Sequence, residues 1–397
     1  MHIYDSRTTK LKDMPIEACT QQFLNVEVDR YRCIDCNETI SDDIPFKHPG
    51  TRITRRAAEW IKALLLMNNS IKAVSKLTGI HWETISRIHK NMMLSKIESF
   101  EQSLKERGYK PKYLAIDEFA IYKGHTYATC VMDLEIGNII WVGKGRAIND
   151  FRKFFEDIDK DYLSDVAAVA MDMNASFNKL VKEYIPHADI VYDRYHFQAQ
   201  FGKDVLGAVR LEEARERKQL ADDLTGSINS SDDRTEILLL KAEQRAARSE
   251  YGTLKRSRWT LPANKRNLSD NKMTALNKIL SEHSKIATCY ALKEDVCGLF
   301  ELTDEKSARK GWTKWFNAAK QSGIPQLMKF ASIKESRIDG LVAHAKHSIT
   351  TGRLEGYNNK IKVVKRIGYG YRNEEYFFTL IKYLSLPANR NQSPKNP

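Results

Sequence analysis

The spacing of hydrophobic and polar positions changes twice along the chain. Between residues 53 and 92 apolar side chains recur at helical spacing, whereas between 113 and 192 they form short runs typical of buried strands. From 203 to 345 the pattern is helical again, rich in charge and without a clear strand. The pattern therefore predicts an α+β multidomain chain in which a mixed sheet separates two helical regions.

The first helical region has the layout of a helix-turn-helix. A helix over Ile53–Met67 is followed by a short one over Ile71–Thr78, which Ser70 can cap and Gly79 can end. A further helix over Ile80–Lys90 completes the motif. A plain helical hairpin is the alternative. If the module binds DNA, the candidate contact residues are Arg52, Arg55, Arg56, Thr84, Arg87 and Lys90.

The strand region opens on the apolar run Tyr113–Ile121, which carries Asp117 and Glu118 in its middle. Two more strands joined by a turn at Gly137-Asn138 make an antiparallel trio, and two helix–strand units follow. The predicted strands are 113–121, 126–132, 138–143, 166–171 and 190–192, and the predicted helices are 148–158 and 177–184. A strand that returns through a helical crossover lies parallel to an earlier one, so Asp172, at a strand end, can lie beside Asp117.

Three acids are candidates for metal-assisted phosphodiester chemistry. Mg²⁺ takes oxygen ligands, and several carboxylates converging on it suit phosphate as a further ligand. Asp117, Asp172 and Glu355 would form such a cluster. Glu355 is expected in the first turn of a late helix that Thr351 can cap. The alternatives are that Asp117 is a strand acid paired with a neighbouring arginine and that Glu355 only complements the dipole of its helix. Glu118 is left out because alternation points it to the other face of the sheet.

Other polar residues near these acids are candidates for supporting roles or for contacts with DNA. Asp193 follows the last strand and, with His196, is a candidate for a supporting role, against plain capping of a strand end. Asn359, Lys362 and Arg366 fall on one face of the late helix, where they could contact substrate phosphates or simply face solvent.

The first 50 residues contain half of a possible zinc site. Cys33 and Cys36 form a C-x-x-C pair after the alternating segment 26–32, as in a zinc ribbon. A closed site needs four ligands, and Cys19 and His48 are weak candidates for the others. Zinc binding is therefore doubtful, and a second pair is expected upstream of Met1 or absent.

Composition narrows the class of protein. The net charge of +13, from 64 Lys and Arg against 51 Asp and Glu, favours a polyanionic partner, chiefly nucleic acid. No apolar run is long enough for a membrane span, and the N-terminus lacks the apolar core of a signal peptide. Six scattered cysteines indicate a reducing cytoplasm. The segment Tyr251–Trp259 interleaves basic and aromatic residues, typical of a nucleic-acid contact or of an ordinary surface loop.

Four stretches in order resemble the DDE transposases of bacterial insertion sequences, in particular the ISL-three group. They are Ala115–Ala120, Ala170–Asn174, Val191–Phe197 and Arg353–Lys362, and the resemblance runs over about residues 10 to 390. It implies an RNase H-like mixed five-stranded sheet with flanking helices, and Asp117, Asp172 and Glu355 as the metal-binding triad for Mg²⁺ or Mn²⁺, with two ions expected. It also implies that 203–345 is a large helical insertion in the catalytic core.

The resemblance gives the chain a domain plan. A partial zinc-ribbon-like segment (1–50) precedes a helix-turn-helix domain (51–95) and a linker helix (96–112). The first part of the core (113–202), the helical insertion (203–345), the final core helices (346–387) and a disordered tail (388–397) follow. The implied partners are double-stranded DNA, as the element's terminal inverted repeats and the target, and further copies of the chain on that DNA. The implied location is the bacterial cytoplasm, at the nucleoid.

The sequence leaves three functions open. The first is metal-dependent DNA cleavage at insertion-sequence ends followed by strand transfer into target DNA. The second is a sequence-specific helix-turn-helix regulator with an inert core. The third is a structure-selective nuclease of the same fold that cuts without joining. Loss of cleavage on substitution of Asp117 or Glu355 would separate the first and third from the second.

Overall fold

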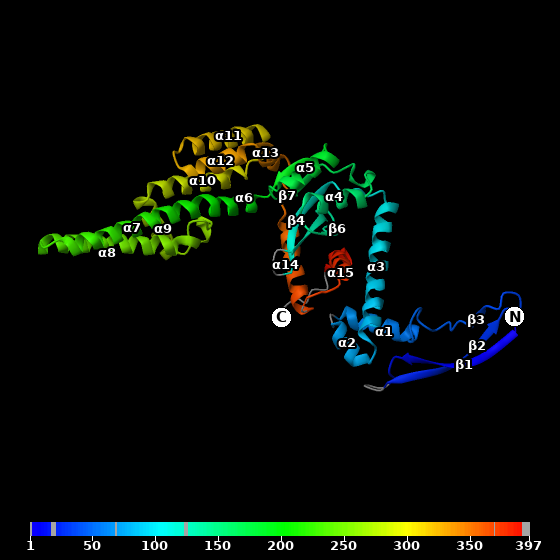
Figure 1. The fold of residues 1–397 in the computed structure, drawn as a ribbon. Helices are drawn as coiled ribbons and strands as arrows, with labels where there is room; N and C mark the ends of the chain where they lie inside the picture. Colours follow the sequence, from blue (N-terminus) through cyan, green and yellow to red (C-terminus); the bar gives the residue numbers. More distant parts are fainter. Residues whose placement is uncertain (1, 17–20, 68–69, 123–125, 369, 391–397) are drawn as a thin grey trace. The chain divides into compact units, whose positions relative to one another are not determined.

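The computed structural model describes residues 2–16, 21–67, 70–122, 126–368 and 370–390 (Figure 1). The chain divides into two compact units. The first unit consists of Met1–Tyr109, Gly137–Val142 and Gly356–Pro397, and the second of Lys110–Ile136 and Gly143–Glu355.

The first unit opens with a three-stranded antiparallel sheet. Its strands are β1 (His2–Asp13), β2 (Gln22–Arg32) and β3 (Thr39–Ser41), in the order β1-β2-β3. Leu11 and Val28 are buried with Ile44 in a small core. The hydrophobic pattern did not predict β1, because most of its positions are polar and only a few of its side chains reach that core.

The predicted helices of the helix-turn-helix region are present. They are α1 (Arg55–Leu66), α2 (Ile71–Thr78) and α3 (Trp82–Glu106). Ser70 caps α2 by accepting from the amide of Ala73, and Gly79 ends α2 at a φ of 62°, a conformation that favours glycine. Apolar side chains of the three helices share one core that includes Ala57, Val74 and Ile88.

One helix stands where the sequence predicted a recognition helix and a separate linker helix. α3 continues without a break from Trp82 to Glu106, because Met92, Met93 and Ile97 keep an apolar face through the expected boundary. That face packs on α15 (Glu374–Ser385), where the His89 ring lies 2.6 Å from the Tyr376 hydroxyl.

A five-stranded sheet runs through the middle of the chain. Its strands are β4 (Tyr113–Tyr122), β5 (Thr126–Asp133), β6 (Ile139–Lys144), β7 (Ala168–Met171) and β8 (Asp189–Tyr192). The order is β6-β5-β4-β7-β8, with β5 antiparallel to β4, and with β7 parallel to both β4 and β8. The predicted mixed sheet of five strands is therefore confirmed.

Two helices provide the crossovers of this sheet. α4 (Ile148–Asp157) and α5 (Ala175–Tyr184) pack together through aromatic rings, with centroids 4.7 Å apart for Phe151 and Phe177. The short 3₁₀ helix η1 (Asp161–Leu163) lies between α4 and β7. These apolar contacts explain why the phenylalanine-rich stretch after residue 150 forms a helix against the sheet.

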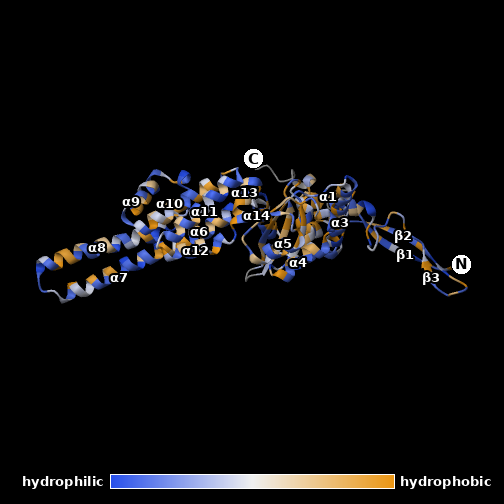
Figure 2. Cartoon of the chain, turned by 90° about the horizontal axis from the view of Figure 1, so that it is seen from above, coloured by the Kyte–Doolittle hydropathy of each residue, from blue (hydrophilic) through white to orange (hydrophobic). Residues whose placement is uncertain are grey.

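The segment after β8 is helical, as predicted. α6 (Arg194–Phe201) continues through a π-helical turn, η2 (Gly202–Gly207), into the long helices α7 (Ala208–Ser230) and α8 (Arg234–Arg256), which pair as a hairpin. Many positions on α7 and α8 are hydrophilic (Figure 2). The remaining elements are η3 (Ser257–Trp259), η4 (Lys265–Asn267), α9 (Asp270–Glu282), α10 (Ser284–Leu299), α11 (Glu305–Gln321), α12 (Pro325–Glu335) and α13 (Ile338–Lys346).

An aromatic cluster holds α6 to the helices that follow it. The Phe197 ring is fully buried and lies 5.3 Å from that of Trp312 on α11 and 5.4 Å from that of Phe330 on α12. The helix that follows β8 is thereby fixed to the rest of the helical segment.

The chain closes with α14 (Gly352–Ile367), α15 and α16 (Pro387–Arg390). The tail was predicted to be disordered from residue 388, but α16 extends through residue 390, and residues 391–397 lie outside the described part. Among the described residues, no helix is long and apolar enough to cross a membrane.

Candidate active site

Asp117 and Asp172 come at matching positions on two neighbouring parallel strands. Ile116 of β4 pairs with Met171 of β7, and the residue that follows each of them is an aspartate, Asp117 in β4 and Asp172 after β7. Neighbouring strands lie about 4.8 Å apart, and paired residues of parallel strands point to the same face. The predicted parallel pairing of these two strands is therefore confirmed, and Asp117 and Asp172 are the residues that follow its last pair.

Asp117 lies inside β4, opposite Cys130 of β5. One carboxylate oxygen of Asp117 accepts from the amide of Glu118 at 2.8 Å, and the Cys130 thiol lies 3.6 Å from the Asp117 carbonyl oxygen. Burial raises the pKa of the Cys130 thiol well above its usual range, and the nearby Asp117 charge adds to the shift. Cys130 is therefore a neutral, buried neighbour of Asp117.

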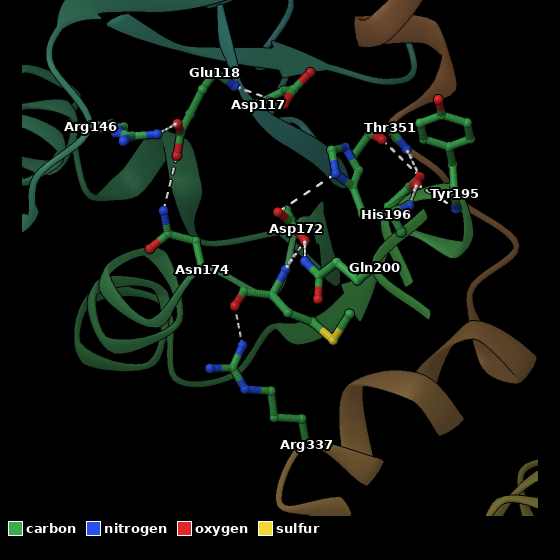
Figure 3. Close-up of polar contacts among 12 residues, drawn as sticks. Asp117, Glu118, Arg146, Asp172, Asn174, Tyr195, His196, Gln200, Arg337 and Thr351 are labelled. Atoms are coloured by element: carbon green, nitrogen blue, oxygen red, sulfur yellow. Dashed lines mark hydrogen bonds and ion pairs between the residues drawn. The ribbon is translucent and has the colours of Figure 1, made fainter. Parts of the chain in front are cut away.

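Asp172 has a looser set of partners at the end of β7 (Figure 3). Its Oδ1 accepts from the Met173 amide at 2.6 Å and from the Gln200 side chain at 3.5 Å. The His196 ring lies 3.6 Å from Oδ2, and the Asp172 side chain is 34% exposed. The predicted neighbour His196 thus contacts Asp172, and the carboxylate still faces open space.

A second layer of polar residues behind Asp172 was not predicted from the sequence. Lys334 of α12 is buried and donates to Gln200, and Arg337 donates to the carbonyl of Met173. Burial lowers the pKa of Lys334, while the charge of Asp172 is among those that oppose the shift. The one sequence signal for this layer was a lysine, Lys334, on the buried face of an apolar helix. Its partner Gln200 is far away in the sequence, so the contact could not be predicted.

Asp193 follows β8 as Asp172 follows β7, since Met171 pairs with Tyr192. Its Oδ1 caps α6 by accepting from the amides of Tyr195 and His196 at 2.8 and 3.2 Å. Its Oδ2 accepts from the amide and the hydroxyl of Thr351 at 3.1 and 2.7 Å. Asp193 therefore links the end of β8 to the residue that precedes α14.

Glu355 lies in the first turn of α14, and its amide donates to the Thr351 carbonyl at 2.8 Å. A second contact fixes this turn: the Arg353 guanidinium donates to the carbonyls of Leu134, Glu135 and Ile136 in the turn after β5, at 3.2 Å for Glu135 and 3.0 Å for Ile136. One helical turn of about 5.4 Å separates Glu355 from the anchored Thr351.

The positions of the three acids do not amount to a closed cluster. Among the described residues, no group of three or more His, Cys, Asp or Glu side chains is arranged to hold a metal ion. Asp117 and Asp172 are adjacent through the strand register, and Glu355 comes on a helix start that is anchored beside β8.

Glu118 makes a different set of contacts from Asp117. Its Oε1 accepts from the Asn174 side-chain amide at 3.0 Å, and its Oε2 lies 3.4 Å from the Arg146 guanidinium (Figure 3). The two side chains diverge from β4, as the alternation of a strand requires. Glu118 is therefore an anchor for the loop after β7.

Several predicted DNA-contact residues of the first unit have protein partners. Arg56 forms an ion pair with the buried Asp13, and Lys90 pairs with Glu375 at 2.7 Å. Arg87 donates to the Gly50 carbonyl at 2.8 Å, while Arg55 reaches the Lys47 carbonyl at 3.4 Å. Arg52 is exposed and Thr84 is half-buried.

The predicted polar face of α14 is exposed at three positions. Asn359, Lys362 and Arg366 all face solvent, and the Lys362 ammonium donates to Asn359 at 3.0 Å. This face is therefore accessible to a ligand from solvent.

Cys33 and Cys36 lie in the turn between β2 and β3. The Cys33 amide donates to the Glu38 carbonyl at 2.8 Å, and the Asn37 amide donates to the Cys33 carbonyl at 3.1 Å. Hydrogen bonds from the amides of Cys36 and Asp35 lower the pKa of the Cys33 thiol. His48 lies in a separate turn beside Pro49, and Cys19 is outside the described residues.

Asp117 inside β4 and Asp172 just after the end of its parallel neighbour β7, in a chain that also carries a helix-turn-helix fold, indicate an enzyme that acts on DNA. Comparison with known families specifies the class. The ISL3 DDE family model, described as "Transposase", matches residues 114–381. A second model, described as "Helix-turn-helix domain of transposase family ISL3", matches residues 43–91. The chain belongs to the ISL3 family of DDE transposases.

Individual relatives agree with this assignment. The chain is 30% identical to the transposase for insertion sequence element IS1001 of Bordetella parapertussis, over 98% of its own length and 86% of the relative. It is 23% identical to the transposase for element IS1557 of Mycobacterium tuberculosis, over 94% of its length and 80% of the relative. The protein is thus a transposase, and the alternative of a DNA-binding regulator with an inert core is not favoured.

Proposed function

We propose that Asp117, Asp172 and Glu355 are the catalytic carboxylates of this transposase, on an RNase H-like sheet. The observation that carries the proposal is the register of β4 and β7, which gives Asp117 and Asp172 matching positions on parallel neighbours. The first turn of α14 is anchored to Asp193, which follows β8, and to the turn after β5, and the proposal assigns Glu355 of this turn to the same site as the two aspartates.

The donor set of this site suits a hard divalent cation. Carboxylate oxygens are the ligands that Mg²⁺ and Mn²⁺ prefer. Asp172 is partly exposed, and among the described residues its Oδ2 has one polar contact, with the His196 ring at 3.6 Å. Asp117, Asp172 and Glu355 would hold the metal, with two ions expected. When bound, these ions supply activation of the attacking oxygen and stabilisation of the leaving one.

The chain's other residues hold and orient the reacting parts. Gln200 and His196 restrict the Asp172 carboxylate, while Asp193 and Arg353 fix the helix start that carries Glu355. In this proposal the helix-turn-helix binds the element's terminal repeats, and Asn359, Lys362 and Arg366 contact phosphates. Further copies of the chain assemble on the DNA. The proposal also includes the division into seven segments predicted from the sequence and a location at the bacterial nucleoid.

The test uses DNA that carries the cognate element end, with Mg²⁺ or Mn²⁺ supplied. Asp117→Asn and Glu355→Gln should each lower the rate of nicking by about a thousandfold, because removal of a ligand costs several kcal/mol of transition-state stabilisation. Glu118→Gln is the matched control, since this neighbouring acid contacts Asn174 and Arg146 instead. Full cleavage by Asp117→Asn would refute the assignment.

A joining assay separates transposition from simple cutting. A pre-nicked end offers a free 3′-hydroxyl, which the proposed enzyme transfers into target DNA by in-line displacement. Joined product from the unmodified chain, absent in both acid variants, supports strand transfer. Cleavage without any joined product would favour the structure-selective nuclease instead.

A further inference from the structure

One side of α8 carries a row of cations, with Gly252 between Arg248 and Lys255. Lys241, Arg245, Arg248, Lys255 and Arg256, called here the α8 stripe, recur at intervals that keep them on one side of a helix. All five are exposed, and among the described residues none of them has an acidic partner within salt-bridge distance. The stripe extends over about 22 Å at 1.5 Å per residue.

The acids of α8 lie on its other side. Glu236, Glu243 and Glu250 are about half a helical turn away from the stripe, and Glu250 pairs with Arg217 of α7 at 3.0 Å. A helix face that only needs to be solvated usually mixes both signs of charge. Within the described part of the chain, this separation leaves the five cations without a carboxylate at salt-bridge distance.

The stripe leads to an exposed tryptophan. Trp259 in η3 is 75% exposed, and the Arg258 guanidinium lies 4.8 Å from the centre of its ring. A large aromatic side chain left this open forgoes the free energy of burial, about 1.5–3 kcal/mol for a large apolar group. An exposed aromatic ring beside cations is the arrangement with which proteins stack on nucleobases.

Hydrogen bonds from two buried side chains fix the segment that carries Trp259. The buried Arg210 of α7 donates to the carbonyls of Leu254 and Lys255 at 2.9 and 3.3 Å, which satisfies the last turn of α8. The buried Ser257 hydroxyl donates to the Leu254 carbonyl at 2.8 Å. Trp259 is therefore presented by an anchored turn rather than by a loose loop.

We propose that the α8 stripe and Trp259 form a DNA-binding surface of the helical insertion, distinct from the helix-turn-helix and from the carboxylates. The stripe follows the phosphate backbone over about six base pairs, and Trp259 stacks on a base left unpaired at the end of the duplex. The inference rests on the proposed function only in taking DNA as the substrate. It requires no metal and no cleavage.

The first experiment measures the salt dependence of DNA binding by the full chain in EDTA, so that cleavage does not contribute. The variant Lys241→Gln/Arg245→Gln/Arg248→Gln should lower the slope of log K against log salt by about 2.7, at about 0.9 for each phosphate that the protein no longer neutralises. The control is Lys278→Gln/Lys285→Gln/Arg309→Gln, which removes the same charge from cations that already pair with Glu282, Glu212 and Asp339. Its slope should stay close to that of the unmodified chain.

The second experiment tests Trp259 with two DNA ligands, a blunt duplex and the same duplex with a single-stranded overhang. Trp259→Ala should weaken binding of the overhang duplex by about tenfold, leave the blunt duplex nearly unchanged, and keep the salt slope. Trp259→Phe should restore most of the affinity, because a phenyl ring also stacks. Melting temperatures equal to that of the unmodified chain show that the variants are folded.

The outcomes separate this surface from the catalytic proposal. Asp117→Asn should bind both ligands normally, so a failure of the acid assignment leaves the binding result intact. An unchanged slope in the stripe variant, an equal loss in the control, or equal weakening of both DNA ligands by Trp259→Ala would each overturn the inference. The inference would also be overturned if the α8 stripe of the unmodified chain bound an acidic protein more tightly than DNA.

Discussion

Two aspartates at equivalent strand ends have opposite environments. Asp172 and Asp193 follow residues that pair in the parallel ladder of β7 and β8. Asp172 is 34% exposed and one of its oxygens has only a long contact with His196, whereas Asp193 is 4% exposed and accepts from four donors. The two aspartates therefore share residue type and strand position, and they differ in how many hydrogen bonds their carboxylate oxygens accept. An acid whose oxygens are all occupied is an anchor, and one with an open oxygen can take a ligand.

The largest expected effect is on catalysis, from Asp172→Asn. Cleavage and joining should fall by about a thousandfold, because an amide is a poor replacement for an anionic ligand. The free energy of unfolding should change by less than about 0.5 kcal/mol, since the weak contacts with Gln200 and His196 tolerate an amide. Rates on cognate DNA and a denaturant melt measure the two effects. A variant that unfolds readily and cuts normally would reverse the roles assigned to the two aspartates.

Asp193→Asn should show the opposite pattern, with a moderate loss of stability. The amide oxygen can still cap α6, but the amide nitrogen cannot accept from the Thr351 amide and hydroxyl. The unpaired buried donors should cost about 1–3 kcal/mol of unfolding free energy. Asp304→Asn is the control, because Asp304 caps α11 at an exposed site where asparagine serves equally well. An unchanged melt for Asp193→Asn would contradict its anchoring role.

The sequence predicted the positions of these acids better than their environments. The strands around Asp117 and Asp172 follow from local apolar runs and from the rule for crossover connections, and the register confirms their pairing. The partner of Asp193 is Thr351, 158 positions away, and no local pattern links the two. The same holds for Lys334, which reaches Gln200 across 134 positions. Contacts made through side chains of distant elements leave no periodic signal.

Errors in the predicted elements have local causes. β1 was missed because an exposed antiparallel strand needs few apolar side chains, and its polar residues read as loop. The sequence prediction ended the helix-turn-helix domain at residue 95 and began a separate linker helix at 96, but α3 keeps its apolar face through Met92, Met93 and Ile97. The extent of a helix depends on that face, so α3 continues through the predicted boundary.

A smaller effect on catalysis is expected from Arg353→Lys. A lysine is a single point donor and cannot bridge the carbonyls of Leu134, Glu135 and Ile136 as the planar guanidinium does. The first turn of α14 should then lose part of its positioning, which lowers the cleavage rate by about tenfold while DNA affinity stays unchanged. Single-turnover rates and binding measured separately test the split. Arg309→Lys, at a surface pair with Asp339, is the control, and an equal loss in affinity and rate would instead indicate that Arg353 contacts DNA.

The smallest effect concerns a third aspartate, Asp189, at the start of β8. Burial opposes its ionisation, but hydrogen bonds from Lys346 and His347, each 2.8 Å long, outweigh burial and lower the pKa of Asp189. A carboxyl with a lowered pKa in the folded state stabilises the fold above its ordinary pKa of about 3.9, and that contribution is lost as pH falls through the folded value. Because the side chain is 41% exposed, Asp189→Asn should cost only about 0.5 kcal/mol at pH 7. The difference between melts of the two proteins should stay constant from pH 7 to about pH 4 and then shrink as the pH falls further. A difference that persists in acid would mean that Asp189, like Asp193, acts through its geometry rather than through its charge.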